Sequence, residues 1–197
     1  MRILLIGATG TLGRAITAEL APRHEIVPAS LSKSALRVDL ADPESVRALY
    51  RDAGTPDAVI CAAGRSRPGA LSALDDAAWS ASLANKLMGQ VNLVRFGMDR
   101  LADGGSFTLT GGMLAHDPSP GTVAIATVNA ALEGFVRGAA LDLPRGLRVN
   151  LVSPPWVSET LIARGMDPDL GVPAAQVAAL YAASVEGGVS GTVFDMP

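Results

Sequence analysis

Short apolar runs alternate with longer helical stretches along the chain. The apolar runs predict strands, at Arg2–Ile6, Glu25–Ala29, Arg37–Leu40, Asp57–Ala62, Ser106–Thr110, Leu147–Val152 and Gly191–Asp195. The stretches between them predict helices over Arg14–Leu20, Asp75–Leu101, Thr122–Leu143 and Pro173–Val185, and another that opens with Asp42 as N-cap and Pro43 at its first position. This alternation predicts an α/β fold, a doubly wound parallel sheet with helices on both faces. The longest irregular segments are expected at residues 65–74 and 153–172.

The first strand runs directly into three glycines with the spacing Gly7-x-x-Gly10-x-x-Gly13. A strand, a glycine-rich turn and a helix in this order are typical of a Rossmann-like dinucleotide-binding unit. Gly7 would permit the tight turn, Gly10 would let the backbone approach a pyrophosphate, and Gly13 would let the helix pack closely on the strand. The helix N-terminus would offer its free N–H groups to the phosphates. The alternative is an ordinary tight turn between a strand and a helix.

Composition narrows the function classes. The 197 residues are expected to form one domain over residues 1–197, and the hydrophobic fraction of 49% suits a compact α/β protein. A net charge of −3 gives no electrostatic footprint for nucleic acid, and no apolar run reaches the length of a membrane span. The single cysteine, Cys61, cannot form an internal disulfide, which favours a reducing cytoplasm. We therefore expect a cytoplasmic protein with neither a nucleic-acid nor a membrane partner.

Four further segments, together with the glycine turn, resemble the short-chain dehydrogenase/reductase family. Asp39-Leu40 resembles the acidic pair that contacts adenine in that family, and Cys61-Ala62-Ala63-Gly64 resembles its Asn-Asn-Ala-Gly segment. Lys86-Leu87-Met88-Gly89 stands where Asn-x-x-Gly is usual. Pro154-Pro155-Trp156-Val157 resembles the family's Pro-Gly segment, with Pro155 replacing glycine. The resemblance covers nearly the whole chain and implies an NAD(P)-dependent oxidoreductase.

The family's catalytic residues are absent. Its chemistry rests on Tyr-x-x-x-Lys and an upstream serine, and neither Tyr50 nor Tyr181 is followed by lysine at the required spacing. In the register that the flanking segments set, the serine position is Gly112, the tyrosine position is Ile125 and the lysine position is Asn129. Neither Gly112 nor Ile125 has a side chain that could donate a proton. The remaining polar groups near this site are Thr108, Thr110 and His116, and His116 is expected to be a surface residue.

Lys86 and Asn129 look exchanged relative to the family. Lys86 occupies the family's asparagine position and Asn129 its lysine position, and the resemblance implies that both positions lie beside the nicotinamide ribose. The exchange would keep an ammonium and an amide in the site, so Lys86 and Asn129 are the candidate catalytic residues. The alternative is that Lys86 is a solvated or snorkelling residue, because it lies off the helix stripe formed by Trp79, Leu83, Leu87 and Val91.

The segment after the second strand favours one cofactor. Members that prefer NAD place Asp or Glu there to bind the ribose 2′-hydroxyl, whereas this chain has Ser30-Leu31-Ser32-Lys33-Ser34. Lys33, with Arg14, would neutralise a 2′-phosphate, although the segment could also be an unrelated polar turn. We therefore expect NADP(H) to be favoured over NAD(H). The expected cofactor-binding residues are Gly7, Thr9, Gly10, Thr11, Leu12, Gly13, Arg14, Ser30, Ser32, Lys33, Asp39, Leu40, Ala62, Ala63, Gly64, Lys86, Pro154 and Val157.

These observations leave two main functions open. One is an oxidoreductase that acts on a small carbonyl or alcohol through a non-standard site. The other is a catalytically silent NADP(H)-binding regulator or redox sensor. A homologue that has also lost the nucleotide is disfavoured by the intact glycine turn. The helix over Thr122–Leu143 carries only Glu133, Arg137 and Asp142 as charged residues, which predicts a second buried face. The alternative is that loops of the same chain cover this helix. The resemblance implies that this helix pairs subunits in a homodimer or homotetramer.

Overall fold

One parallel sheet of seven strands organises the chain, in the order β3-β2-β1-β4-β5-β6-β7. In this computed structural model, which describes residues 1–196, the strands are β1 (Arg2–Ile6), β2 (Glu25–Ser30), β3 (Leu36–Arg37), β4 (Ala58–Cys61), β5 (Ser106–Thr110), β6 (Arg148–Ser153) and β7 (Val193–Asp195). Chain order reverses between β1 and β4, and open parallel sheets bind ligands at the carboxyl ends of the strands beside such a reversal. The predicted doubly wound parallel sheet is confirmed.

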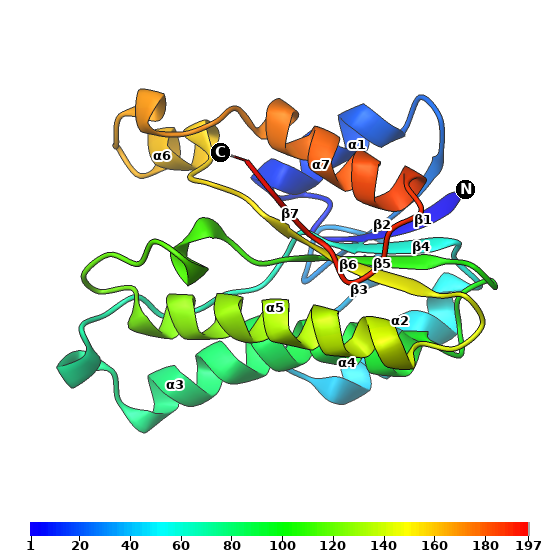
Figure 1. Cartoon of the computed structure of the whole chain (residues 1–197), viewed down its shortest axis with the longest axis horizontal. Helices are drawn as coiled ribbons and strands as arrows, with labels where there is room; N and C mark the ends of the chain where they lie inside the picture. Colours follow the sequence, from blue (N-terminus) through cyan, green and yellow to red (C-terminus); the bar gives the residue numbers. More distant parts are fainter. Residues whose placement is uncertain (197) are drawn as a thin grey trace.

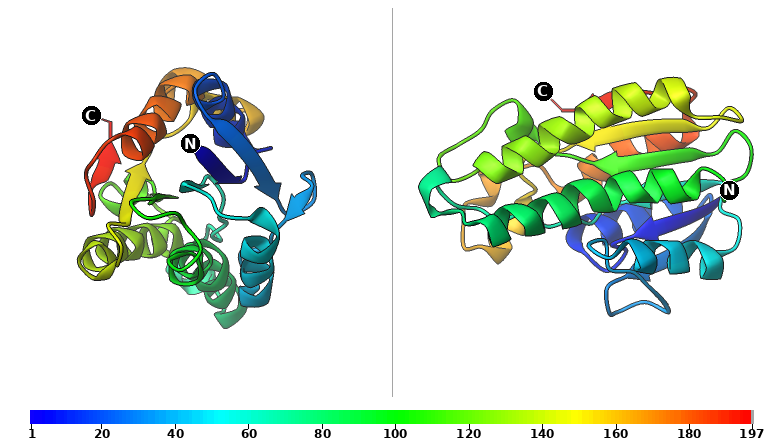
Figure 2. Two further views of the ribbon diagram at one scale, coloured as in Figure 1. Left: turned by 90° about the vertical axis from the view of Figure 1, so that its right-hand side faces the viewer. Right: turned by 90° about the horizontal axis from the view of Figure 1, so that it is seen from below.

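Helices cover both faces of the sheet, as Figures 1 and 2 show. On one face lie α1 (Thr11–Leu20) and α7 (Ala174–Glu186), and on the other lie α2 (Pro43–Ala53), α4 (Gly89–Gly97) and α5 (Val123–Asp142). Successive residues of β1 serve opposite faces: Ile3 and Leu5 belong to the core under α1 and α7, whereas Leu4 and Ile6 belong to the core under α2, α4 and α5. Burial on both faces explains why the central strands read as continuous apolar runs.

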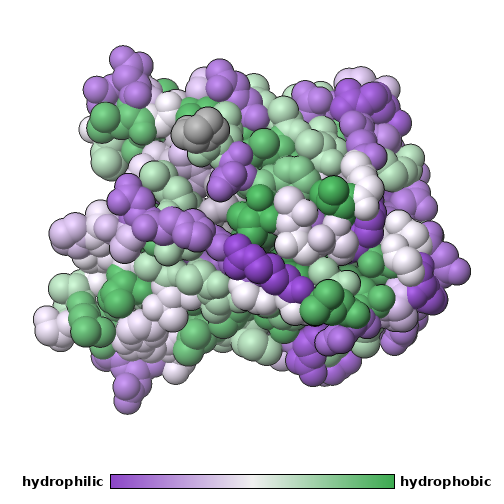
Figure 3. Space-filling model, viewed as in Figure 1, coloured by the Kyte–Doolittle hydropathy of each residue, from purple (hydrophilic) through white to green (hydrophobic). Residues whose placement is uncertain are grey.

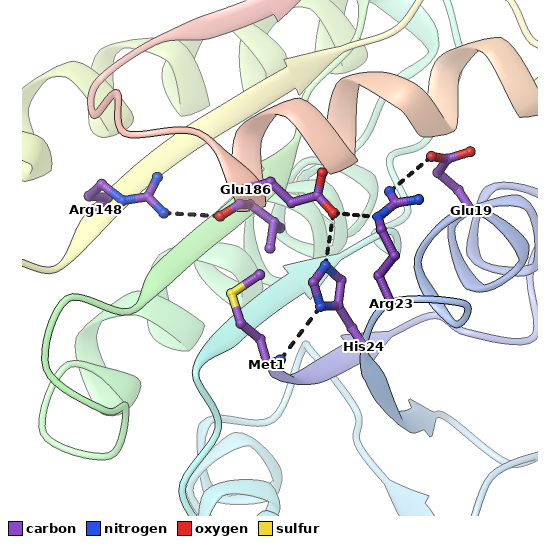
Figure 4. Close-up of polar contacts among 7 residues, drawn as sticks. Met1, Glu19, Arg23, His24, Arg148 and Glu186 are labelled. Carbon is purple, nitrogen blue, oxygen red and sulfur yellow. Dashed lines mark hydrogen bonds and ion pairs between the residues drawn. The ribbon is translucent and has the colours of Figure 1, made fainter.

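The ends of α1 and α7 meet at the amino-terminal edge of the sheet, and Figure 4 shows the contacts between them. Glu186 accepts a hydrogen bond from Nε of Arg23 at 2.9 Å, and its Oε1 lies 2.8 Å from Nε2 of His24. These hydrogen bonds, with His24 contributing most, lower the pKa of the Glu186 carboxyl. Arg148 on β6 donates to the carbonyl groups of Ser184 and Val185 on α7. These contacts fix the two helices at the edge opposite the glycine turn.

Two expected elements differ from the structure, the helix over residues 75–101 and the third strand. The helix expected over residues 75–101 consists of α3 (Asp76–Ser82), a π-helical turn (Leu83–Met88) and α4. Turns of this kind interrupt α-helices frequently at functional sites. Strand β3 stops at Arg37 instead of Leu40, because the Asp39 carboxylate accepts a hydrogen bond from the Ala41 N–H at 2.9 Å and turns the chain.

Other element boundaries are corrected as well. The first helix begins at Thr11, three residues before the expected start at Arg14. The segment 153–172 is not irregular throughout, since it contains α6 (Ser158–Ala163) and a short 3-10 turn (Pro168–Leu170). Glu159 of α6 accepts hydrogen bonds from the Ala174 N–H, which caps α7. The predicted N-cap is confirmed: the Asp42 carboxylate accepts from the Glu44 N–H at 2.9 Å, and Pro43 begins α2. Across residues 1–196, no helix is both long and apolar enough to cross a membrane.

Candidate functional site

The glycine turn joins the carboxyl end of β1 to the N-terminus of α1. The Gly7 N–H donates to the Ala29 carbonyl of β2 at 2.8 Å, and the Gly10 N–H donates to the Gly7 carbonyl at 2.9 Å. Gly7 has a φ of +86°, which favours glycine. Gly10 is the N-cap of α1, so the first N–H groups of the helix face the turn without intrahelical partners. This arrangement fits a bound anionic group such as a pyrophosphate.

The segment after β4 lies against this turn. The Ala62 N–H donates to the Ile6 carbonyl at 2.9 Å. A Cβ on Gly7 would lie 2.8 Å from the Ala62 carbonyl oxygen. The structure therefore brings together the two segments that the sequence analysis assigned to the cofactor, Gly7–Arg14 and Ala62–Gly64. Arg14 is exposed at the rim of the turn, and its guanidinium donates to the Thr9 carbonyl at 2.7 Å.

Basic residues gather beyond the carboxyl end of β2. Ser30 is buried, and its hydroxyl accepts a hydrogen bond from the Lys33 N–H at 2.9 Å. Ser32 and Lys33 are exposed. Arg37, an exposed residue of β3, pairs in register with Ser30 and adds a cation that the sequence analysis missed. Its position as a basic residue at the start of the third predicted strand is the sequence feature that could have identified it.

The Asp39-Leu40 pair is divided between surface and core. Asp39 is exposed, whereas the Leu40 side chain is buried with 5% exposure. A Cβ on Gly89 would lie 2.6 Å from Cβ of Leu40, so Leu40 packs beneath the start of α4. Any ligand contact of Leu40 is therefore limited to its main chain. At the opposite side of the site, the Pro154 carbonyl accepts from the Met113 N–H at 3.0 Å, and the Val157 side chain is buried.

Lys86 points into the carboxyl edge of the sheet from the π-helical turn. Its ammonium donates a hydrogen bond to the Gly111 carbonyl at 3.2 Å, just beyond β5. Its stem packs on Gly64, where a Cβ would lie 2.7 Å from Cδ of Lys86. Burial lowers the pKa of Lys86 from 10.5 to about 8, against a smaller opposing effect of the Cys61 thiol. The partly exposed Lys86 side chain is thus anchored to the end of β5, which favours a place in the candidate site over that of a solvated or snorkelling helix residue.

Asn129 binds the carbonyl group next to the one that Lys86 binds. Its Nδ2 donates to the Gly112 carbonyl at 3.3 Å, and the residue is 3% exposed. Its Oδ1 is buried and has no hydrogen-bond partner within residues 1–196. No direct Lys86–Asn129 hydrogen bond occurs there either, and the two side chains bind the adjacent carbonyl groups of Gly111 and Gly112. A buried acceptor without a partner suits a donor supplied by a ligand or by water.

The remaining polar groups of this edge have structural partners. Nε2 of His116 lies 2.6 Å from Oε1 of the buried Glu133, and the His116 side chain is 65% exposed, as expected for a surface residue. Thr108 contacts the Ser184 hydroxyl at 2.7 Å, and Thr110 contacts the Tyr181 hydroxyl at 2.7 Å. Both threonines therefore join β5 to α7.

Gln90, which is fully buried on α4, is another residue of this edge that the sequence did not reveal. Its amide binds the main chain of Thr110 at the end of β5. A polar residue in the middle of a helix gives no signal of such a contact, because only the fold brings the helix to the strand.

Two other features bear on the chemistry. Within residues 1–196, no group of three or more His, Cys, Asp or Glu side chains could hold a metal ion. A surface cavity of about 330 Å³ lies beside Asp57 and Arg148. A second one of about 280 Å³ lies beside Arg51 and Arg100. Both lie at the amino-terminal side of the sheet, away from the glycine turn and Lys86. Parallel sheets bind ligands at the opposite edge, so we place the candidate site at the carboxyl ends of β1, β4 and β5.

Comparisons with known proteins bear on the family of the chain. The sequence matches the family described as enoyl-(acyl carrier protein) reductase over residues 11–183. It is 32% identical over 138 residues to 2,3-dihydro-2,3-dihydroxybenzoate dehydrogenase of Bacillus subtilis (strain 168), covering 67% of this chain and 50% of that enzyme. The chain thus spans about half the length of this curated relative.

Solved structures extend the comparison to the whole fold. The protein lin1944 from Listeria innocua is similar with a TM-score of 0.96 and 36% identity, over 100% of both chains. A short-chain dehydrogenase from Burkholderia cenocepacia J2315 in complex with NADP has a TM-score of 0.82 and 26% identity, over 99% of this chain and 95% of that one. From the family match over residues 11–183 and these whole-chain similarities, the chain belongs to the short-chain dehydrogenase/reductase family.

Proposed function

We propose that the protein binds NADP(H) and interconverts a small carbonyl compound and its alcohol through a site in which Lys86 and Asn129 replace the usual catalytic residues. The observation that carries this proposal is the pair of hydrogen bonds from Lys86 and Asn129 to the adjacent Gly111 and Gly112 carbonyls, with the buried Asn129 Oδ1 left unpaired. This pair provides a cation and a free hydrogen-bond acceptor at the carboxyl edge of the sheet. The family match and the glycine turn favour nucleotide binding at that edge.

The residues at the carboxyl edge fit the parts of the cofactor. The α1 N-terminus and Gly10 would hold the pyrophosphate. Lys33, Arg37 and Arg14 are exposed cations near the end of β2 and would bind a ribose 2′-phosphate. The Burkholderia relative, which was solved with NADP, supports this choice of cofactor. When bound, NADPH supplies a hydride to the carbonyl carbon and becomes NADP⁺, while the carbonyl oxygen must receive a proton.

Lys86 is the proposed source of that proton. The family's tyrosine position holds Ile125, which has no acidic group. A pKa of about 8 keeps most of the Lys86 amine protonated at neutral pH and still lets it release a proton. Asn129 would accept a hydrogen bond from a ribose hydroxyl through its free Oδ1. The reaction balances because the carbonyl group gains one hydride and one proton and becomes the alcohol, and Lys86 takes up a new proton from water.

A second candidate function is a silent NADP(H)-binding regulator or redox sensor. The absence of side-chain donors at Gly112 and Ile125 favours it, because the family's acid and its carbonyl-polarising hydroxyl are both gone. The two functions share the nucleotide site and differ only in turnover. We also propose a cytoplasmic location, since Cys61 is a buried free thiol.

The test begins with fluorescence titration of the protein with NADPH and with NADH. A panel of small aldehydes and ketones is then added, and loss of NADPH absorbance is followed. Binding with turnover supports the oxidoreductase, and binding without turnover supports the regulator. Failure to bind either nucleotide contradicts both.

A further inference from the structure

Gln90 occupies an unusual position for a buried polar residue. It lies on α4 with 0% exposure, and its amide faces the last residue of β5. Its Oε1 accepts a hydrogen bond from the Thr110 N–H at 2.8 Å, and its Nε2 donates to the Thr110 carbonyl at 2.9 Å. The same Nε2 lies 3.1 Å from the Lys86 carbonyl, one turn earlier in the chain.

This amide takes the place of a missing strand. The pairing of β4 with β5 ends at Ile60 and Thr108, whereas β5 continues to pair with β6 as far as Thr110 and Val152. Beyond Thr108, the side of β5 that faced β4 would leave main-chain groups of Thr110 unpaired in the protein interior. Buried main-chain groups are almost always paired. The Gln90 side chain supplies one donor and one acceptor there, as a neighbouring strand would.

Lys86 is held at both its main chain and its ammonium group. The Lys86 main chain is bound by Gln90, and the Lys86 ammonium is bound by Gly111, the residue directly after Thr110. Gln90 therefore sets the distance between the π-helical turn that carries Lys86 and the strand end that receives its amine. Resting on the proposed function of Lys86, we propose that Gln90 is a positioning residue that holds the Lys86 amine at the cofactor site.

The test follows the Lys86 amine directly by NMR. Lys33 and Lys86 are the lysines of the chain, so protein labelled with ¹³C-lysine gives two side-chain signals that Lys33→Arg assigns. Gln90→Met keeps the size of the side chain and removes all three hydrogen bonds. Gln90→Glu keeps the acceptor for Thr110 and loses the donor. Ser184→Ala is the matched control, because it removes a buried hydrogen bond to Thr108 of the same strand without touching Lys86.

The expected result is a change in the titration of Lys86. In the wild type the Lys86 signal should titrate near 8, and in either Gln90 variant the midpoint should rise toward the ordinary 10.5. The titratable group that faces the amine, Cys61, is unchanged in both variants. Gln90→Glu adds a carboxyl that itself favours the ammonium, so the uncharged variant Gln90→Met decides the outcome. NADPH affinity should fall about tenfold in the Gln90 variants, the effect of one lost hydrogen bond to a charged group. Ser184→Ala should leave the titration and the affinity unchanged.

The outcomes separate this inference from the proposed function. A Lys86 signal that titrates as in the wild type in whichever Gln90 variants fold would overturn the positioning role. If the signal shifts in the Gln90 variants, but Lys86→Met binds NADPH and turns over like the wild type, Gln90 positions Lys86 and the proposed function of Lys86 is wrong. The NMR signal reports on the amine in the folded protein whether or not a substrate is known.

Discussion

A Cβ on Gly13 would lie 2.1 Å from the carbonyl oxygen of Gly7. The first turn of α1 is therefore packed directly on the backbone of the glycine turn, and no side chain fits between them. Gly10 differs, because a Cβ there would lie 3.3 Å from the same oxygen and its φ of −78° is accessible to any residue. The two glycines thus have separable roles, one in packing and one at the surface that faces the pyrophosphate.

We expect Gly13→Ala to destabilise the fold and Gly10→Ala to weaken nucleotide binding. Gly13→Ala forces α1 away from β1, so its melting temperature should fall by several degrees, equivalent to about 2 kcal/mol or more. Gly10→Ala should melt close to the wild type and bind NADPH more weakly. Thermal melts with and without NADPH distinguish the two. Equal melting of both variants would contradict the separation of roles.

Lys33→Ala should reduce affinity for NADPH more than for NADH. Its ammonium is exposed beyond β2, where no carboxylate would bind a ribose 2′-hydroxyl. Loss of one charge-assisted contact to phosphate costs about 1.5–3 kcal/mol, roughly ten- to a hundredfold in affinity. Both affinities are measured for the wild type, Lys33→Ala and Arg37→Ala. Equal affinity of the wild type for the two nucleotides would rule out the proposed preference.

The strands and the glycine turn could be predicted because their signals are local. Each central strand is buried on both faces and therefore reads as an apolar run. The turn carries its three glycines within one short segment, from Gly7 to Gly13. The end of β3 was missed, because the Asp39 side chain stops the strand by binding the Ala41 N–H. The π-helical turn was missed as well, since the sequence around Lys86 has no feature that separates it from a regular helix.

The candidate site was predicted only in part, for a different physical reason. Lys86 could be singled out by its position relative to the family, but its burial depends on Gly64 and Gly111, which are distant in sequence. Asn129 has a free oxygen only because the Gly112 carbonyl orients its amide. Gln90 resembles an ordinary helix residue until the fold places β5 against it. Contacts between distant segments decide these roles, and a local pattern does not contain them.

Helix α5 exposes a row of small and apolar residues, bordered by the exposed charged residues Arg137 and Asp142. Thr127, Ala130, Gly134, Gly138 and Leu141 are exposed along it, and Leu141 is 86% exposed. Over α5, in the lower half of the view, Figure 3 shows the pale and green colours of small and apolar residues beside a purple strip of hydrophilic ones. Such a face allows close approach of a second helix, which supports the expected homodimer or homotetramer.

Gly134→Arg should therefore convert the assembly to monomers. No described atom lies within 4 Å of a Cβ on Gly134, so the substitution fits the protomer and interferes only with a partner on α5. Gly188→Arg is the control, because a Cβ at Gly188 also has no described atom within 4 Å and lies beyond α7. Light scattering at micromolar concentration measures the mass. A monomeric wild type, or a Gly134→Arg assembly of unchanged mass, would refute an interface on α5.

Lys86→Met should stabilise the protein near neutral pH. The Lys86 pKa is about 8 in the folded protein and 10.5 ordinarily, so the folded state disfavours the ammonium. This cost is fully present below pH 8 and is lost as the pH rises from 8 to 10.5, where the unfolded chain alone still holds the proton. At 1.36 kcal/mol for each pKa unit, and allowing for the partial exposure of the side chain, removing the amine should stabilise by about 1–3 kcal/mol.

Denaturant unfolding of both proteins from pH 6 to pH 10.5 measures this gain. Burial raises the pKa of the Cys61 thiol to about 11 and the Lys86 charge lowers it, so this thiol stays protonated in both folded proteins only well below that pH, and there the difference between them reports Lys86. The stabilisation by Lys86→Met should be constant below pH 7 and shrink above pH 8. A variant less stable than the wild type at neutral pH would show that the amine contributes more to folding than its burial costs.

Lys86 should also govern the pH dependence of any turnover. As the proton donor in carbonyl reduction, it must be protonated, so the rate should be constant below pH 7 and fall as the pH rises through about 8. In alcohol oxidation it must accept a proton, and the rate should rise over the same range. Lys86→Met should lower the rate by about 10²–10⁴-fold, the usual contribution of a general acid, and abolish this dependence. Asn129→Ala should instead raise the dissociation constant for NADPH and keep the pH profile, because it removes a cofactor contact and leaves the donor in place. If Lys86→Met reduces carbonyls as fast as the wild type with the same profile, the proton comes from another group, and the active site must be sought away from the end of β5.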